Sequence, residues 1–140
     1  MIHSLWLRRR WAYGAFLLVG VLRIPSRVGF HLVAPSCDTH LTLANASSSI
    51  TKVPHLAVFA IFFLLTVLQF ERLDGGAFGW SLLATTALGF LVEIEEGATR
   101  TGYCKLTDVL PDVAGAVIAG AALLVAMRIV TLRVGSVMRP

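Results

Sequence analysis

Long apolar segments alternate with short polar ones along this chain of 140 residues. The apolar segments are longer than the 4–8 residues typical of a buried strand, so they are expected to be helices. Each approaches the roughly 20 residues that a helix needs to cross a bilayer. The pattern predicts an all-α integral membrane bundle of four transmembrane helices, at about residues 8–25, 53–70, 77–95 and 108–127.

The first apolar segment has two interpretations. Arg8–Arg10 followed by a short apolar stretch is also how a signal peptide begins. No small-x-small cleavage site follows, and the next residues include Arg23, Pro25 and Arg27. We therefore favour an uncleaved first span, whose arginines reach the headgroup region of the bilayer.

The composition supports a membrane location. Hydrophobic residues make up 56% of the chain and charged residues 14%, against about 45–50% and about 25% in a soluble domain. So little charge excludes an ordinary water-soluble domain, and it also excludes intrinsic disorder, which needs the opposite balance. We expect a single membrane domain over residues 1–140.

The basic residues lie at the ends of apolar segments and give a net charge of +4. They do not form the basic patch of a nucleic-acid-binding protein, so no nucleic-acid partner is expected. Four spans place both termini on one side, and the clusters at Arg8–Arg10 and at Arg128, Arg133 and Arg139 favour the cytoplasm for that side. We expect a multi-pass protein of the cell membrane with both termini cytoplasmic.

The two cysteines lie in the two longest polar segments. Residues 25–51, which contain Cys37, are expected to be a loop, and Cys104 lies in the loop before the last span. The chain has no C-x-x-C motif, so a zinc or thioredoxin-type site has no support. One disulfide between the two loops and two unpaired thiols both remain open, because spacing alone cannot establish a bridge.

Small residues recur along the last span. Gly115-x-x-x-Ala119 and Ala116-x-x-x-Gly120 are small-xxx-small pairs, which let two helices approach closely. We interpret them as packing positions within the chain rather than as a dimerisation motif.

Spaced pairs of ionisable residues mark three helix ends that a four-span topology places on the outer face. A buried acid in a span is costly, about 2.5–3.5 kcal/mol at the bilayer centre, and usually faces a partner inside the protein. Each residue alone has a simpler explanation as a helix cap, an interfacial anchor or an interhelical hydrogen-bonding group. The pairs are Lys52 with His55, Glu93 with Glu96, and Asp108 with Asp112, and Arg100 lies in the loop between the last two pairs.

Together these residues predict a polar site. Carboxylates that crowd one another are suited to general acid or base chemistry, so Glu93, Asp112 and His55 are the catalytic candidates. The candidates for substrate binding are Lys52, Arg100, Glu96 and Asp108. No cofactor is predicted. A divalent cation held by the carboxylates with His55 is an alternative, although their spacings match no specific metal signature.

The same residues resemble a family. Lys52-Val-Pro-His55 opening one span, Glu93-x-x-Glu96 closing the next, a loop arginine, and Asp108-x-x-x-Asp112-x-x-Gly115 opening the last resemble the VanZ-like family of small bacterial membrane proteins. The resemblance covers about half of the chain, from Lys52 to Gly120.

This chain departs from the family pattern at three positions. Glu96 stands where the family usually has Gln, Asp112 stands where it usually has Asn, and Arg100 lies closer to the glutamates. The first two differences make the site more acidic.

The resemblance implies a multi-span cell-envelope protein, because the family takes its name from a protein linked to teicoplanin resistance. The expected partners are membrane lipids or a lipid-linked envelope precursor, which the site would bind or modify. The alternatives are a membrane-embedded acid/base enzyme and a purely structural membrane protein. The sequence does not set the oligomeric state.

Overall fold

The computed structural model describes residues 10–20, 37–38, 42–99 and 104–137, which form helices and one isolated β-bridge, with no strand among them. This confirms the all-α prediction. Residues 10–20 are helical. The helices that follow are α2 (Leu43–Ile50), α3 (Val53–Val67), α4 (Gly75–Thr99), the short 3₁₀ turn η1 (Leu106–Asp108) and α5 (Val109–Val137).

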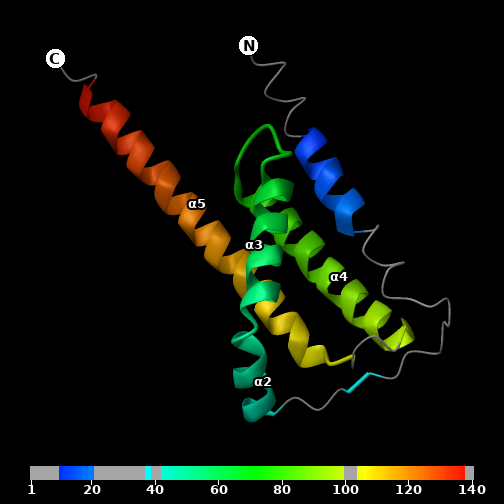
Figure 1. Cartoon of the computed structure of the whole chain (residues 1–140). Helices are drawn as coiled ribbons and strands as arrows, with labels where there is room; N and C mark the ends of the chain where they lie inside the picture. The colour runs from blue at the N-terminus through cyan, green and yellow to red at the C-terminus, as the bar shows by residue number, and fades with distance from the viewer. Residues whose placement is uncertain (1–9, 21–36, 39–41, 100–103, 138–140) are drawn as a thin grey trace.

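Successive long helices alternate in direction (Figure 1). In that view α3 runs upward, α4 downward and α5 upward, so the start of α3, the end of α4 and the start of α5 lie together at the lower end. α5 packs most extensively against α3, and α4 packs against both. The helix of residues 10–20 contacts α3 through Tyr13 and Phe16, whose ring centroids lie 5.9 and 6.0 Å from that of Phe62.

Local signals define where α3 and α4 begin. Pro54 lies in the first turn of α3, where a missing N–H is harmless because that group would have no partner within the helix. Asp74 caps α4, since its Oδ1 accepts the Ala77 N–H at 2.9 Å.

Small side chains make the helix contacts close. The buried positions of α4 recur at every fourth residue and end at the site, in the order Ala77, Ser81, Thr85, Gly89 and Glu93. Facing them and α3, α5 buries Gly115, Ala116, Ala119 and Gly120. A Cβ on Gly115 would lie 2.3 Å from the Leu56 carbonyl oxygen, so α3 and α5 meet at backbone distance. The two small-xxx-small pairs therefore provide close packing within the chain, as predicted.

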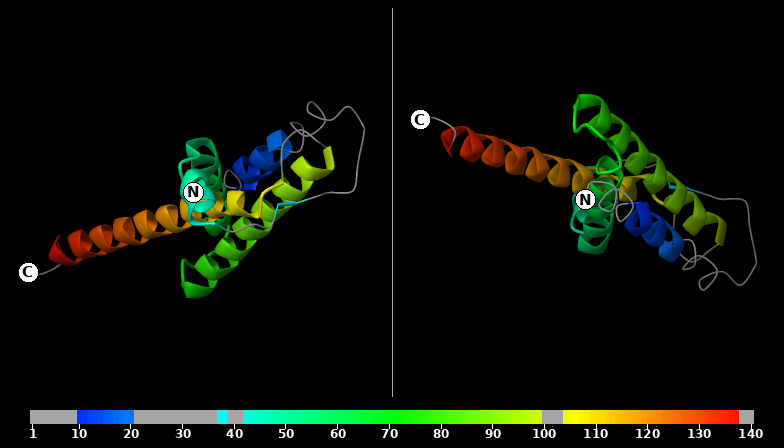
Figure 2. Two further views of the ribbon diagram at one scale, coloured as in Figure 1. Left: turned by 90° about the horizontal axis from the view of Figure 1, so that it is seen from below. Right: turned by 90° about the horizontal axis from the view of Figure 1, so that it is seen from above.

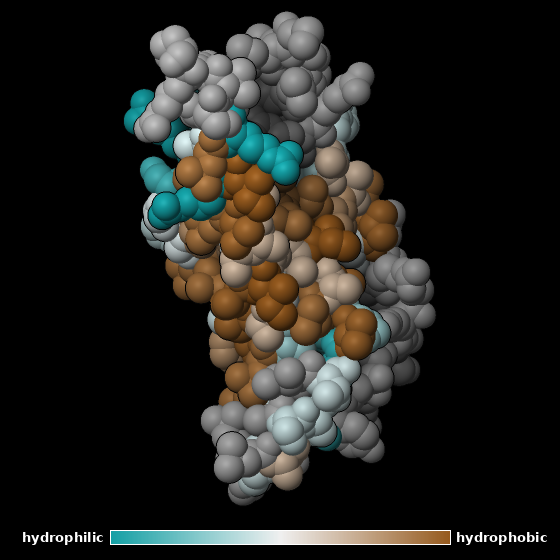
Figure 3. Space-filling view, turned by 90° about the vertical axis from the view of Figure 1, so that its left-hand side faces the viewer, coloured by the Kyte–Doolittle hydropathy of each residue, from teal (hydrophilic) through white to brown (hydrophobic). Residues whose placement is uncertain are grey.

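The outer surface is apolar, while several of the largest fully buried side chains are polar. Glu93, Thr85, Asp112 and Ser81 are fully enclosed. Large hydrophobic side chains are exposed on each long helix; they include Trp80, Leu91, Val117, Ile118 and Val130. Apolar side chains cover the middle of the face drawn in Figure 3, with hydrophilic ones gathered above it. Such a surface suits lipid better than water.

Two of the described helical segments are long and apolar enough to cross a membrane, namely Gly75–Thr99 and Leu106–Arg133. α3, with 15 residues, is shorter than the roughly 20 that a full crossing needs. Of the expected first span, only residues 10–20 are described. The count of four spans therefore stays a prediction.

Two expectations about element bounds differ from the structure. The segment expected to be a loop contains helix α2, Leu43–Ile50, whose serines are weak helix formers. It is stabilised instead by packing against η1 and α5. α5 continues to Val137, ten residues past the expected end, and its second half projects alone from the bundle (Figure 2).

Candidate functional site

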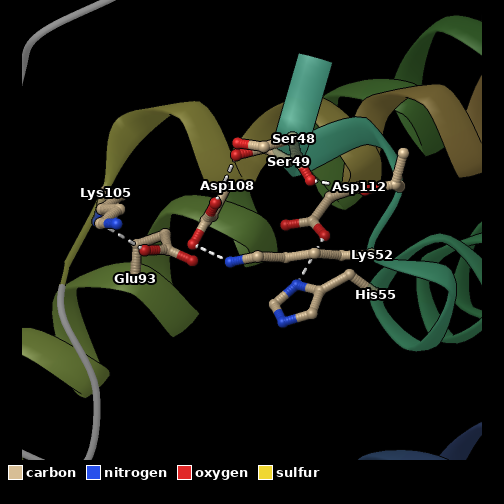
Figure 4. Close-up of polar contacts among 9 residues, drawn as sticks. Ser48, Ser49, Lys52, His55, Glu93, Lys105, Asp108 and Asp112 are labelled. Atoms are coloured by element: carbon tan, nitrogen blue, oxygen red, sulfur yellow. Dashed lines mark hydrogen bonds and ion pairs between the residues drawn. The ribbon is translucent and has the colours of Figure 1, made fainter. Parts of the chain in front are cut away.

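Five of the seven predicted site residues meet at the lower end of the bundle (Figure 4). They come from α3 and the residue before it, α4, η1 and α5, so at least one member of each spaced pair lies in the cluster. Arg100 lies outside the described residues. Glu96 lies on α4, three residues beyond Glu93, and is partly buried. The five that meet are Lys52, His55, Glu93, Asp108 and Asp112.

The first contact joins α3 to the start of α5. Lys52 Nζ forms an ion pair with Asp108 Oδ2. The other oxygen of the same carboxylate accepts the Ser49 hydroxyl at 2.7 Å, so both oxygens are satisfied. Asp108 is buried, whereas 43% of the Lys52 side chain is exposed. The pair therefore has a buried negative end and an accessible positive end.

A second pair lies one turn further along the same two helices. His55 Nδ1 lies 3.1 Å from Asp112 Oδ1, and since a carboxylate only accepts, Nδ1 donates. Asp112 is fully buried, while 27% of the His55 side chain is exposed. Figure 4 shows the imidazole with its other nitrogen, Nε2, turned away from the carboxylates. Asp112 therefore orients the imidazole from its buried side, while the exposed part of the ring remains accessible.

The second oxygen of Asp112 has no hydrogen-bond partner among the described residues. It packs against Gly89 of α4, where a Cβ would lie only 2.7 Å from it. An unpaired buried carboxylate oxygen is costly. The hydrogen bond from His55 is therefore the main interaction that offsets the cost of burying the Asp112 carboxylate.

Glu93 is held by the main chain rather than by a side chain. It lies in the last two turns of α4, where the negative end of the helix dipole disfavours an acid. The Lys105 backbone N–H donates to Glu93 Oε2 at 2.8 Å and supplies the compensating donor. Glu93 is fully buried, so it does not reach the outer surface.

A disulfide fixes the segment that carries Lys105. Cys37 and Cys104 are bonded, which settles the alternative that the sequence left open. A β-bridge lies beside it, in which Asp38 N–H donates to Cys104 O at 2.8 Å and Leu106 N–H donates to Asp38 O at 3.2 Å. The cross-link therefore lies directly against the donor to Glu93 and within four residues of Asp108.

Three functional contributors were missed from the sequence. Ser49 lies in the segment that was expected to be a loop, and nothing in the local sequence indicates its bond to Asp108. Lys105 contributes its backbone N–H, which the identity of its side chain does not indicate. Gly89 carried a usable signal, because a glycine inside an apolar helix, one turn before Glu93, often indicates close approach by another group.

Each of the three buried carboxylates of the cluster bonds to a different partner, and they do not converge on a shared position. No group of three or more His, Cys, Asp or Glu among the described residues is arranged to hold a metal ion. The chemistry that the described geometry offers is therefore hydrogen bonding and charge at Lys52 and His55, together with proton transfer at the His55 imidazole.

Comparison of the chain with protein-family models, with curated proteins and with solved structures found no match in any of the three.

Proposed function

We propose that this chain is a multi-pass membrane protein of the cell envelope whose polar site binds the head group of an envelope lipid or lipid-linked precursor. Support for the membrane comes from the apolar outer surface and from the two helical segments of sufficient length. The fully buried Glu93 and Asp112 fit this view, because acids at membrane depth face a protein interior.

The proposed orientation places the site on the outer face and both termini in the cytoplasm. The Cys37–Cys104 disulfide supports it, because structural disulfides persist in oxidising compartments and the bridge adjoins the site. Fusions to a reporter active only outside the cytoplasm test the orientation. We expect activity when the reporter is inserted near Asp38 and none when it follows Arg139. The reverse pattern would contradict the proposal.

One observation carries the binding function. Lys52 and His55 are the accessible ends of two pairs whose carboxylate ends are buried, so the site offers polar donors beside an apolar surface. The resemblance to the VanZ-like family, with its link to teicoplanin resistance, rests on these same residues. It favours an envelope ligand and, as the cellular consequence of binding, glycopeptide tolerance.

A second candidate function is acid/base catalysis on a lipid-linked substrate. The His55–Asp112 pair favours it, because a buried carboxylate that orients an imidazole leaves the other ring nitrogen available to exchange a proton. Turnover of an envelope lipid by the purified protein would establish this candidate. Binding without turnover would leave the first function standing.

Paired substitutions test the binding function. Lys52→Met with Asp108→Asn, and His55→Gln with Asp112→Asn, each remove one ion pair without leaving a buried charge alone. We expect both variants to accumulate in membranes like the wild type. We also expect the lipid that co-purifies with the wild type, identified by mass spectrometry, to be lost from them.

Arg72→Met is the matched control, because Arg72 is an exposed cation in the turn between α3 and α4, at the opposite end of α3. Retention of the same lipid by both paired variants would refute the proposed site. Loss of accumulation would favour the structural explanation, in which the pairs serve only as interhelical bonds.

A further inference from the structure

We propose that Lys52 and His55 together bind the terminal phosphate of a lipid, that is, a phosphomonoester head group at the membrane surface. This inference rests on the proposed function and names its ligand class. Lys52 immediately precedes α3 and His55 lies in its first turn, and both side chains reach the same cluster, where they contact Asp108 and Asp112.

The charges are arranged with their positive ends outward. The three carboxylates of the cluster, on Glu93, Asp108 and Asp112, are all buried. Lys52 is exposed and His55 is partly exposed (Figure 4). An approaching group therefore meets the Lys52 ammonium and the His55 imidazole first, with the acids behind them.

Both cations keep donors for a ligand. A lysine ammonium has three N–H donors, and one of those on Lys52 bonds to Asp108 Oδ2. The protonated imidazole donates from both nitrogens, and only Nδ1 of His55 is engaged by Asp112. A phosphate oxygen could thus accept from each residue without breaking either pair.

The start of α3 adds to the positive potential. The first turn of α3 contains no acidic residue, so the positive end of its dipole is not neutralised within the helix. α5 differs, because Asp112 lies in its first turn. The uncompensated end of α3 is the one that carries Lys52 and His55.

The number of terminal oxygens favours a monoester. A phosphomonoester has three free oxygens and close to two negative charges at neutral pH, so it can accept from the Lys52 ammonium and the His55 imidazole at the same time. A phosphodiester has a single charge and a substituent on either side of the phosphorus. The apolar surroundings favour a lipid over a free anion, since Val53 and Leu110, next to the pairs in sequence, are exposed.

Thermal unfolding of the full-length protein in detergent tests the proposal with three added probes. They are dihexanoyl phosphatidic acid, dihexanoyl phosphatidylcholine and inorganic phosphate, at matched concentrations. We expect phosphatidic acid to raise the unfolding temperature most, because ligand that binds only the folded state stabilises it. The two paired variants should bind it at least about tenfold more weakly, because each loses a hydrogen-bond donor to the charged phosphate.

Each other outcome is decisive. Equal stabilisation by phosphatidylcholine that is lost in the paired variants would overturn the monoester but keep a lipid-binding site. Equal stabilisation by inorganic phosphate would overturn the lipid source. Phosphatidic acid should still stabilise the control variant Arg72→Met. If it also stabilised both paired variants, the assignment of the binding site to Lys52 and His55 would be overturned. In each of these three cases, loss of the co-purifying lipid from the paired variants would still support the proposed function.

Discussion

At the scale of single residues, the sequence identified most of the polar site but not how its members pair. Lys52 with His55 and Asp108 with Asp112 were grouped because each pair shares a helix face. The structure pairs them between helices instead, Lys52 with Asp108 and His55 with Asp112. Spacing within a helix determines which residues face the same way. It does not determine which neighbouring helix they face, because that depends on the rotation of each helix in the bundle.

Gly89 provides a direct test of how tightly Asp112 is enclosed. In Gly89→Ala the new Cβ would lie 2.7 Å from Asp112 Oδ2, so the carboxylate must shift from its present position. We expect a loss of about 1–3 kcal/mol in unfolding free energy, as overpacking typically causes. Equilibrium unfolding in detergent measures it.

Gly79→Ala is the matched control for Gly89, because it lies on the same helix with nothing within 4 Å of its Cβ position. It should be neutral or slightly stabilising, since alanine has the higher helix propensity. Equal stability of the two variants would contradict the close contact at Asp112.

Ser49→Ala tests the contact that the sequence did not reveal. Removal of the hydroxyl leaves Asp108 Oδ1 buried without its donor, and an unsatisfied buried acceptor costs about 1–3 kcal/mol. We expect the unfolding temperature to fall. Ser47→Ala should change little, because the Ser47 hydroxyl bonds to the Ala44 carbonyl at an exposed position. The same fall in both variants would contradict the assignment of the loss to the Asp108 bond.

At the scale of helices, the length of the apolar segments predicted the three long helices, and small residues predicted the close packing of the last of them. The sequence missed α2 because the serines of Leu43–Ile50 disfavour a helix in isolation. Contacts with η1 and α5 override that preference, and such contacts join residues about sixty positions apart, as Ser49 and Asp108 are. These long-range contacts cannot be recognised from the local sequence of α2.

The crossing of α3 and α5 sets the position of both ion pairs. In Gly115→Ala the added Cβ would meet the Leu56 carbonyl oxygen at 2.3 Å, and a backbone group cannot rotate away. The helices must separate, which should pull Lys52 from Asp108 and His55 from Asp112. We expect a loss at or above the upper end of the about 1–3 kcal/mol usual for overpacking, measured by unfolding in detergent.

Gly120→Ala is the graded comparison on the same helix. Its Cβ would lie 3.3 Å from the Phe63 ring, which is able to tilt, so the loss should be clearly smaller than for Gly115→Ala. The opposite ranking would mean that α3 and α5 do not cross at Gly115.

At the scale of the whole molecule, the chain is stabilised by two kinds of cross-connection at one end. Noncovalent pairs join α3 to α5, and the disulfide joins residue 37 to residue 104. The opposite end has the turn between α3 and α4 and the projecting second half of α5 (Figures 1 and 2). These cross-connections and the candidate site therefore lie at the same end of the molecule, so breaking the cross-connections should affect the site.

Reduction of the disulfide tests this coupling. The bond closes a sequence separation of 67 residues, and the constraint that a loop of that size places on the unfolded chain corresponds to a stabilisation of about 4 kcal/mol. Cys37→Ser with Cys104→Ser should lower the unfolding temperature, and a phosphine reductant should lower that of the wild type to match.

The coupling also predicts a loss of binding. Without the bridge, the Lys105 N–H is less firmly held against Glu93 and the turn that carries Asp108 is less constrained, so phosphatidic acid should stabilise the double variant less. Reductant added to the double variant should have no further effect, which controls for damage elsewhere. Full stabilisation of the double variant by phosphatidic acid would show that the cross-link supports the fold without shaping the site.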